Sequence, residues 1–333
     1  MITDLIHRER LAHLPTPLEF LQRFSAHLGG PRIWMKRDDC TGLAGGGNKT
    51  RKLEYLVAAA RAEGADTLVT FGALQSNHAR QTAAAAAKAG FSCVLILTRR
   101  VRWQSTTYES GGNLLLDRVL GADVRIANDP AESQEILGTL QREAQENGRQ
   151  LYVIPTGGSS PVGALGYARC AEELDHDFRV NDLNVAAVMH ATSSTGTQAG
   201  LLAGFSATGS NHKVIGINVS EADGAALEGS IRALSNETGA LLDAPPVGAD
   251  SVHVLHEYMG EDYGIPTAEG RAAIELLART EGILLDPVYS GKGMSGLIDR
   301  VRQGTFDADS DVVFIHTGGG PTLSVYDNAF GST

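Results

Sequence analysis

Hydrophobic residues in this chain fall into short runs separated by longer alanine-rich or polar segments. Runs of strand length lie at residues 66–71, 91–97, 185–191, 213–220 and 311–317. Segments typical of helices, such as "HARQTAAAAAKAG" and "TQAGLLAGFSATG", lie between successive runs. The run at 91–97 is of the continuous type expected of a strand buried on both faces. Strand–helix–strand order with such strands predicts an α/β protein built on parallel sheets.

The chain of 333 residues is long enough for two domains around a sizeable core. A helical stretch at 131–147 is followed by "LYVIPTGGSSPVGALGY", which indicates a domain boundary near residue 155. The sequence contains no internal repeat, low-complexity tract or charge run.

The charge balance narrows the partners that we expect. A formal net charge of −11 argues against nucleic acid and anionic membranes, because both attract basic surfaces. The first residues contain no signal-like apolar segment, and no stretch approaches about 18 apolar residues. We therefore expect a cytoplasmic protein. Cys40, Cys93 and Cys170 lie far apart, so we predict neither a metal site nor a disulfide framework.

A glycine-rich segment, "GLAGGGNKTRKLEYL" at 42–56, nearly matches a phosphate-binding P-loop, but Asn48 separates Gly47 from Lys49. The apolar spacing after Asn48 places Lys49 at a helix start, with Lys52 on the same face. Cations are unfavourable at the positive end of a helix unless an anion is nearby. The two lysines therefore indicate a bound anion; the alternative is that both are solvated surface charges.

A second polar loop joins the first apolar run to a helix. It presents four polar side chains together: Gln75, Ser76, Asn77 and His78. A helix cap needs only one of them, either Ser76 or Asn77. The segment is therefore a candidate ligand site, and a purely structural cap is the alternative.

Two further loops follow strands. The loop after 185–191 supplies hydroxyl and backbone N–H groups suited to an anion, from Ser194, Thr195, Gly196 and Thr197. It has no lysine of its own, and Lys52 would supply the missing charge. The alternative is an ordinary Ser/Thr-rich turn. Tyr289 and Thr317 end the last apolar segments, and either one alone would usually be structural.

Together these segments resemble the fold type II pyridoxal-phosphate enzymes, specifically the D-cysteine desulfhydrase and 1-aminocyclopropane-1-carboxylate deaminase family. The similarity runs nearly end to end through seven ordered motifs. They are "LPTPLEFL", "IWMKRDDCTGLAGGGNKTRKLE", "GALQSNHARQTAA", "VIPTGGSSPVGALGY", "GTQAG", "EGILLDPVYSGK" and "FIHTGGGP". The segments "RDDCTGL", "QSNHARQTAA", "GTQAGL" and "YDNAF" are most similar in sequence to those of the L-cysteate sulfo-lyase branch.

The resemblance implies a role for each candidate residue. Lys49 would bond covalently to pyridoxal 5′-phosphate, and Asn77 would hydrogen-bond its 3′ oxygen. The phosphate would be held by Lys52, Ser194, Thr195, Gly196 and Thr197. Gln75, Ser76, Asn77, His78 and Tyr289 would contact the substrate, with Ser76 and Tyr289 also catalytic. Ser290 and Thr317 would lie at the pyridine nitrogen. "TSSTGT" departs from the family's usual Gly-Ser-Ala-Gly-Thr, which leaves the detailed phosphate contacts open.

The resemblance also implies an architecture. It predicts two open, twisted parallel sheets similar to the tryptophan synthase β subunit. Residues 1–45 and 156–333 would form the large cofactor-binding domain, and residues 46–155 the small domain with the second sheet. A homodimer is implied as well.

The implied reaction is α,β-elimination from a three-carbon amino acid with a sulfur leaving group, giving pyruvate and ammonia. The deaminases carry Glu after the tyrosine and Leu in place of Thr317, whereas this chain has Ser290 and Thr317. Neutral hydroxyls fit the expulsion of a good leaving group better than ring opening. We expect L-cysteate, which would release sulfite, with D-cysteine second and the cyclopropane substrate a distant third.

Two alternatives belong to other functional classes. A phosphotransferase with a degenerate P-loop would need nucleotide, and the inserted Asn48 argues against it. A non-catalytic binding protein for pyridoxal phosphate or another phosphate ligand would have no need of Lys49, Ser76 and Tyr289 together.

Overall fold

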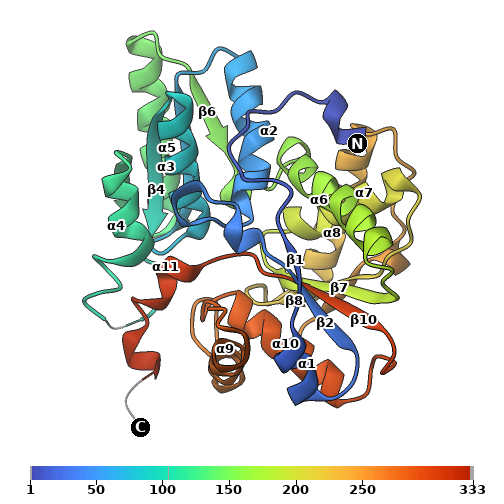
Figure 1. Ribbon diagram of the computed structural model, residues 1–333. Coiled ribbons are helices and arrows are strands. Elements are labelled where there is room, and N and C mark those ends of the chain that lie inside the picture. The colour runs from blue at the N-terminus through green and yellow to red at the C-terminus, as the bar shows by residue number, and fades with distance from the viewer. Residues whose placement is uncertain (1, 104, 331–333) are drawn as a thin grey trace.

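The chain folds around two β-sheets of different size (Figure 1). The computed structural model describes residues 2–103 and 105–330. Within that range the large sheet contains, in spatial order, β1 (Leu18–Phe20), β2 (Arg32–Lys36), β10 (Asp311–Ile315), β7 (Val185–Thr192), β8 (Val214–Asn218) and β9 (His253–Leu255). The small sheet contains β5 (Asp123–Ala127), β4 (Ser92–Thr98), β3 (Thr67–Ala73) and β6 (Leu151–Ile154).

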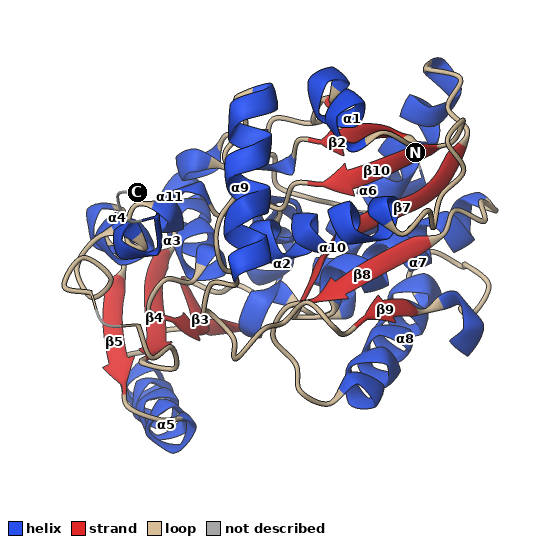
Figure 2. Cartoon of the chain, turned by 90° about the horizontal axis from the view of Figure 1, so that it is seen from below, coloured by secondary structure: helices blue, strands red, loops and turns tan. Residues whose placement is uncertain are grey.

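Helices cover both faces of the large sheet (Figure 2). One face packs on α1 (Gln22–Leu28), α9 (Ala268–Glu281) and α10 (Ser290–Arg302). The other packs on α6 (Pro161–Val180), α7 (Gly196–Thr208) and α8 (Gly224–Ala240). Val188 and Met189 are adjacent in β7 and enter opposite cores, as the two-residue period of a strand requires.

The small sheet is also covered on both faces. α2 (Lys49–Ala62), α3 (Asn77–Ala89) and α4 (Gly112–Val119) pack on one side, and α5 (Pro130–Glu146) packs on the other. The short α11 (Gly320–Leu323) lies near α4 and follows the end of β10. Fully buried Leu95 and Ile96 of β4 face the two opposite cores. This double burial explains the continuous apolar run at 91–97.

The α/β class and the parallel sheets predicted from the sequence are confirmed, with one difference at an edge. β1 pairs with β2 in the antiparallel direction, while the other described strand pairs are parallel. Only α1 and short loops connect β1 to β2, and antiparallel edge strands are common on otherwise parallel sheets. The small sheet's strands lie between residues 67 and 154. The division into 1–45 plus 156–333 and 46–155 stays our proposal.

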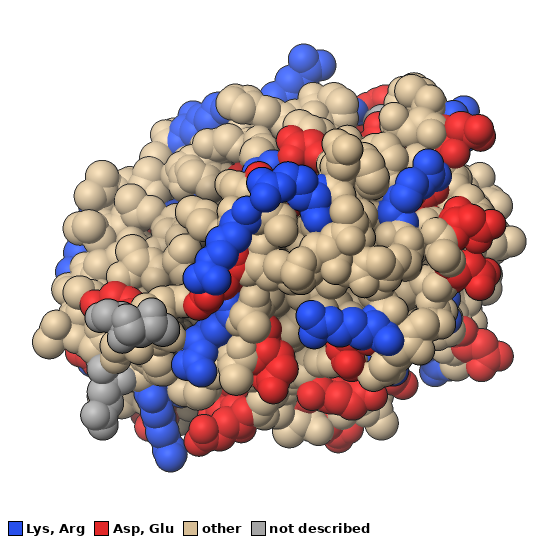
Figure 3. All heavy atoms as spheres, turned by 60° about the horizontal axis from the view of Figure 1, so that its bottom comes forward, with Lys and Arg blue, Asp and Glu red and all other residues tan. Residues whose placement is uncertain are grey.

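The surface carries charges of both signs. On the face drawn in Figure 3, Lys and Arg side chains lie close to Asp and Glu side chains. Such a mixture is ordinary for a surface that faces water.

None of the described helices combines the length and the hydrophobicity needed to cross a bilayer.

Candidate active site

A cavity of about 750 Å³ lies where loops from both sheets meet. Its lining includes residues that follow the carboxyl ends of β3, β7 and β10, where ligands bind in open parallel sheets. Nine of the predicted site residues line it: Lys49, Ser76, Asn77, His78, Ser194, Thr195, Thr197, Tyr289 and Thr317. The fold thus brings together segments that are more than 200 residues apart in the sequence.

Lys49 begins α2 and faces this cavity. The backbone N–H of Asn48 donates to the carbonyl of Thr317 at 3.0 Å, which joins the start of α2 to the end of β10. Gly47 has a φ of +131°, and a Cβ there would lie 2.5 Å from the Gln81 amide. Only glycine fits so close an approach. Burial lowers the pKa of the Lys49 amine to about 8, so a substantial fraction of it is neutral near pH 7 to 8.

Lys52 lies one turn further along α2 and is fully buried. Its amine donates to the carbonyl of Gly157 at 3.1 Å. Burial, and then the charge of Lys49, lower the Lys52 pKa well below its ordinary value. Within the described part of the chain no carboxylate forms an ion pair with this amine. A buried cation site without a protein anion is suited to an anionic ligand.

The start of α7 forms a cradle beside Lys52. A Cβ added to Gly196 would lie 2.8 Å from the Lys52 amine, so glycine leaves this space open. The Gly196 N–H donates to the Ser159 hydroxyl at 3.3 Å, and the Asn48 amide donates to the Thr197 hydroxyl at 3.2 Å. Backbone N–H groups, hydroxyls and an ammonium group at a helix N-terminus are the donors that a phosphate requires.

The start of α3 supplies a second set of groups. The Ser76 hydroxyl caps α3 by accepting from the Ala79 N–H at 3.1 Å, as one sequence alternative stated. Thr70 donates its hydroxyl proton to the Ile154 carbonyl at 2.9 Å, so its oxygen accepts from Nε2 of His78 at 2.8 Å. The proton of neutral His78 is therefore on Nε2. Nδ1, which has no partner within the described residues, keeps a free lone pair. Burial and the two lysines hold the His78 pKa well below its ordinary value.

Asn77 is oriented by Arg80, a residue that the sequence analysis did not assign. Fully buried Arg80 donates to the Asn77 side-chain oxygen and to the carbonyl oxygens of Ala44 and Gly46. The Asn77 amide nitrogen is thereby left to face a ligand, and the glycine-rich loop is fixed beside it. The spacing of three residues on one helix was the available signal.

Two tyrosines meet at the cavity wall. The hydroxyls of Tyr289 and Tyr263 hydrogen-bond to each other, and their ring centroids lie 5.8 Å apart. Burial raises the pKa of both phenols, and the neighbouring phenol adds to the effect at Tyr289. Both therefore hold their protons at neutral pH. The sequence analysis did not assign Tyr263.

Gln75 and Ser290 lie outside the cavity lining. The Gln75 amide donates to the Tyr108 and Gly111 carbonyls at 2.7 and 3.0 Å. The Ser290 hydroxyl donates to the Asp286 carboxylate at 2.5 Å and accepts from the Asp286 N–H at 2.8 Å. Both side chains are engaged with protein, and Thr317 supplies the hydroxyl at this part of the wall.

Comparison with known proteins finds relatives that match nearly the whole chain. The family model described as "Pyridoxal-phosphate dependent enzyme" matches residues 9–318. A protein of Serratia proteamaculans named D-cysteine desulfhydrase is 42% identical over 330 residues, covering 96% of this chain and 98% of that protein. A Klebsiella pneumoniae protein of the same name is 43% identical over 319 residues, with 96% of each chain covered.

Two solved structures also resemble this chain over nearly its whole length. A crystal structure of an ACC deaminase homologue has a TM-score of 0.87 and 34% identity, and covers 99% of this chain and 96% of that one. A hydrogen sulfide-producing enzyme from Fusobacterium nucleatum shares the fold, with a TM-score of 0.65 and 17% identity. The match covers 97% of this chain and 99% of that one. The relatives' names favour the D-cysteine alternative over our L-cysteate expectation, which these comparisons do not specifically support.

The cavity has the donors that the cofactor of this family needs. Lys49 would offer its amine, part of which is neutral near pH 7 to 8, to the aldehyde, and Lys52 with the α7 N-terminus would hold the phosphate. The Asn77 amide and the Thr317 hydroxyl would face the ring. With this fit and the end-to-end match, the chain belongs to the family of pyridoxal-phosphate-dependent enzymes.

Proposed function

We propose that the protein is a carbon–sulfur lyase that eliminates the Cβ sulfur substituent of a three-carbon amino acid, giving pyruvate and ammonia. D-cysteine is the first candidate substrate, because relatives that match 96% of the chain carry the name D-cysteine desulfhydrase. The structural observation that carries the proposal is the Lys49 amine. It faces the cavity with a pKa of about 8, next to a phosphate cradle and a protonated tyrosine.

When bound, pyridoxal phosphate withdraws electrons from the substrate Cα and so makes the α-proton acidic. Lys49 can then take that proton, since its lowered pKa keeps part of it neutral near pH 7 to 8. The Cβ–S bond breaks with its electron pair going to sulfur. The released enamine takes a proton on Cβ and becomes an imine, which water hydrolyses to pyruvate and ammonia.

Tyr289 would protonate the departing sulfur. Its raised pKa means that it enters the reaction with its proton in place. Tyr263 holds the phenol in position through the shared hydrogen bond. A group that keeps its proton at neutral pH serves as an acid in this step rather than as a base.

The pyridine-nitrogen side of the cavity also fits elimination. Thr317 lines the wall, whereas Ser290 is hydrogen-bonded to Asp286. A neutral hydroxyl at the nitrogen would not fix a positive charge on the ring, which a difficult ring opening would need more than sulfur expulsion does.

L-cysteate is a second candidate substrate. The wording of several sequence motifs favours it, and so does a cationic side chain, Arg100, in the cavity lining. The homodimer implied by the resemblance and the cytoplasmic location expected from the sequence also remain proposals.

The test is a substrate panel with the purified holoenzyme. Pyruvate, sulfide and sulfite are measured separately with D- and L-cysteine, D- and L-cysteate and the cyclopropane amino acid. We expect pyruvate and sulfide in equal amounts from D-cysteine. A tenfold higher kcat/KM for L-cysteate, about 1.4 kcal/mol of transition-state preference, would make L-cysteate the substrate. Release of no pyruvate from any sulfur amino acid would contradict the proposed lyase function.

A further inference from the structure

Arg100 lies just past the carboxyl end of β4 and lines the cavity from the small-sheet side. Lys49 and Arg100 are the two Lys or Arg residues in the described cavity lining. Arg100 has no part in the proton transfers described above. Its guanidinium therefore adds a positive charge to a space that already contains the groups for cofactor and proton transfer.

Arg100 is an exposed residue whose guanidinium contacts an aromatic ring that also lines the cavity. Its guanidinium carbon lies 4.7 Å from the centroid of the Tyr263 ring. The Tyr263 hydroxyl in turn contacts the Tyr289 hydroxyl. Arg100 is thus separated by one tyrosine ring from the group that would protonate the leaving sulfur.

The guanidinium remains available for a ligand. The contact with the ring takes up no hydrogen-bond acceptor, and within the described residues none of the guanidinium N–H groups has a hydrogen-bond partner. Within the described residues no carboxylate pairs with it. Two acidic residues also line the cavity, but both have local partners. Asp223 caps α8 through the Ala226 N–H at 3.0 Å, and Glu221 accepts from the Ser220 hydroxyl at 3.1 Å.

We propose that Arg100 binds the sulfur substituent on the substrate's Cβ, so that the site accepts three-carbon amino acids whose Cβ group is an anion or leaves as one. This inference rests on the proposed function. A sulfonate presents several acceptor oxygens and a permanent charge, which match the paired donors of a guanidinium. A thiol gains from Arg100 only as the Cβ–S bond breaks and negative charge develops on sulfur.

The two substrates therefore depend on Arg100 differently. L-cysteate uses the guanidinium both in binding and in the transition state, while D-cysteine uses it mainly in the transition state. Replacing Arg100 by a neutral side chain should lower kcat/KM for L-cysteate more than for D-cysteine. The ratio of the two values then reports on Arg100 without reference to the absolute rate.

The experiment compares the holoenzymes of wild type, Arg100→Gln, Arg100→Lys and Arg99→Gln. Arg99 is the matched control, because it pairs with Glu109 at 3.6 Å on the exposed surface and does not line the cavity. Calorimetry measures binding of 3-sulfopropanoate, which has no amine and cannot react. We expect Arg100→Gln to weaken binding by roughly tenfold or more, Arg100→Lys to weaken it less, and Arg99→Gln to change it by no more than about twofold.

The outcomes separate this inference from the proposed function. The role of Arg100 is overturned if Arg100→Gln binds 3-sulfopropanoate as tightly as wild type. It is also overturned if the wild-type enzyme does not bind 3-sulfopropanoate. Cofactor absorbance and melting temperature show whether Arg100→Gln still folds and binds the cofactor. If it does not, the binding of 3-sulfopropanoate by Arg100→Lys tests the role of Arg100 instead. If the wild-type enzyme turns over no sulfur amino acid, the lyase proposal is wrong. The comparison of 3-sulfopropanoate binding then still tests whether Arg100 binds the sulfur substituent.

Discussion

Lys49 and Lys52 are an unfavourable pair in the protein alone. They occupy one face of α2 near its positive end, and Lys52 is fully buried with a lysine as its charged neighbour. A buried cation without an anion lowers the stability of a fold. The pair makes physical sense once a phosphate is present. We propose that the same residues, which destabilise the cofactor-free protein, contact the cofactor directly.

Lys52→Met should therefore shift two properties in opposite directions. The cofactor-free protein should gain about 1–3 kcal/mol of unfolding free energy, since a buried amine is replaced by an apolar chain. Cofactor affinity should fall by roughly 1.5–3 kcal/mol, since a charge-assisted contact is lost. Denaturant unfolding and equilibrium titration with pyridoxal phosphate measure the two changes.

The stability gain should also depend on pH. The folded pKa of Lys52 lies below its unfolded value of about 10.4. The free-energy cost of burying Lys52 therefore appears as pH falls below the unfolded pKa. The stability gained by Lys52→Met should be larger at pH 7.5 than at pH 10.5. Lys213→Met, at an exposed lysine, should change neither property. Lower stability of cofactor-free Lys52→Met would contradict this account.

The Lys49 pKa gives a separate prediction for cofactor uptake. Only the neutral amine attacks an aldehyde, and the pKa of Lys49 is lowered to about 8 by burial. The rate of cofactor uptake by the cofactor-free protein should rise as pH increases to about 8 and then level off. Stopped-flow absorbance measures the rate. A rate that kept rising to pH 10 would show that burial does not lower this pKa.

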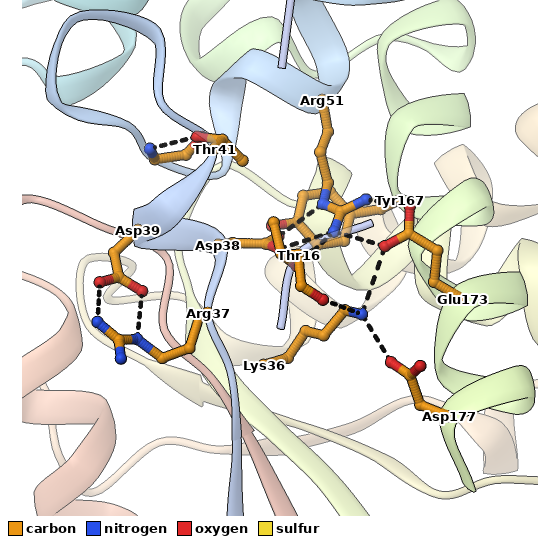
Figure 4. Close-up of polar contacts among 11 residues, drawn as sticks. Thr16, Lys36, Arg37, Asp38, Asp39, Thr41, Arg51, Tyr167, Glu173 and Asp177 are labelled. Atoms are coloured by element: carbon orange, nitrogen blue, oxygen red, sulfur yellow. Dashed lines mark hydrogen bonds and ion pairs between the residues drawn. The ribbon is translucent and has the colours of Figure 1, made fainter. Parts of the chain in front are cut away.

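At the level of elements, α2 is held in place by a buried charge network behind the lysine face (Figure 4). We call it the Arg51 network; its members are Lys36, Asp38, Arg51, Tyr167, Glu173 and Asp177. Arg51 donates to Asp38 at 2.8 and 2.9 Å and to Glu173 at 2.9 and 3.0 Å. The network ties α2 to β2 and α6. It therefore fixes the helix whose first residue is Lys49.

Arg51→Met should cost roughly 3–5 kcal/mol of unfolding free energy, because it leaves the buried carboxylates of Asp38 and Glu173 without their main partner. Arg279→Met is the control. Arg279 is exposed and forms an ordinary helical pair with Glu275, so its loss should cost less than about 1 kcal/mol. Urea unfolding compares both with wild type. Equal effects of the two substitutions would mean that the network does not anchor α2.

At the scale of the whole molecule, the sequence predicted elements with a strong local pattern. The run at 91–97 became β4, and the apolar spacing after Asn48 became α2 beginning at Lys49. Both signals come from nearby residues, namely double burial in a strand and one apolar face of a helix. The antiparallel direction of β1 has no such signal, since it depends on how a short edge strand returns along β2.

The cavity lining was predictable where a loop concentrates unusual residues, and less so where side chains come from distant parts of the chain. The polar runs around Ser76 and Ser194 were visible in the sequence. Arg80 had a local signal in its spacing of three residues from Asn77. Tyr263 and Arg100 were missed because their contacts come from distant parts of the chain. The engagement of Ser290 by Asp286 was missed in the same way, since a sequence does not reveal which hydroxyl is already occupied.

These contacts converge on one cavity, and Lys49 is the group in it that would bond to the cofactor. Borohydride reduction of the holoenzyme followed by peptide mass mapping tests this assignment most directly, because reduction makes the bond between cofactor and lysine permanent. The account predicts the mass of the reduced cofactor on Lys49 and an unmodified Lys52. Finding that mass on Lys52 or on another lysine, or on no lysine at all, would contradict it.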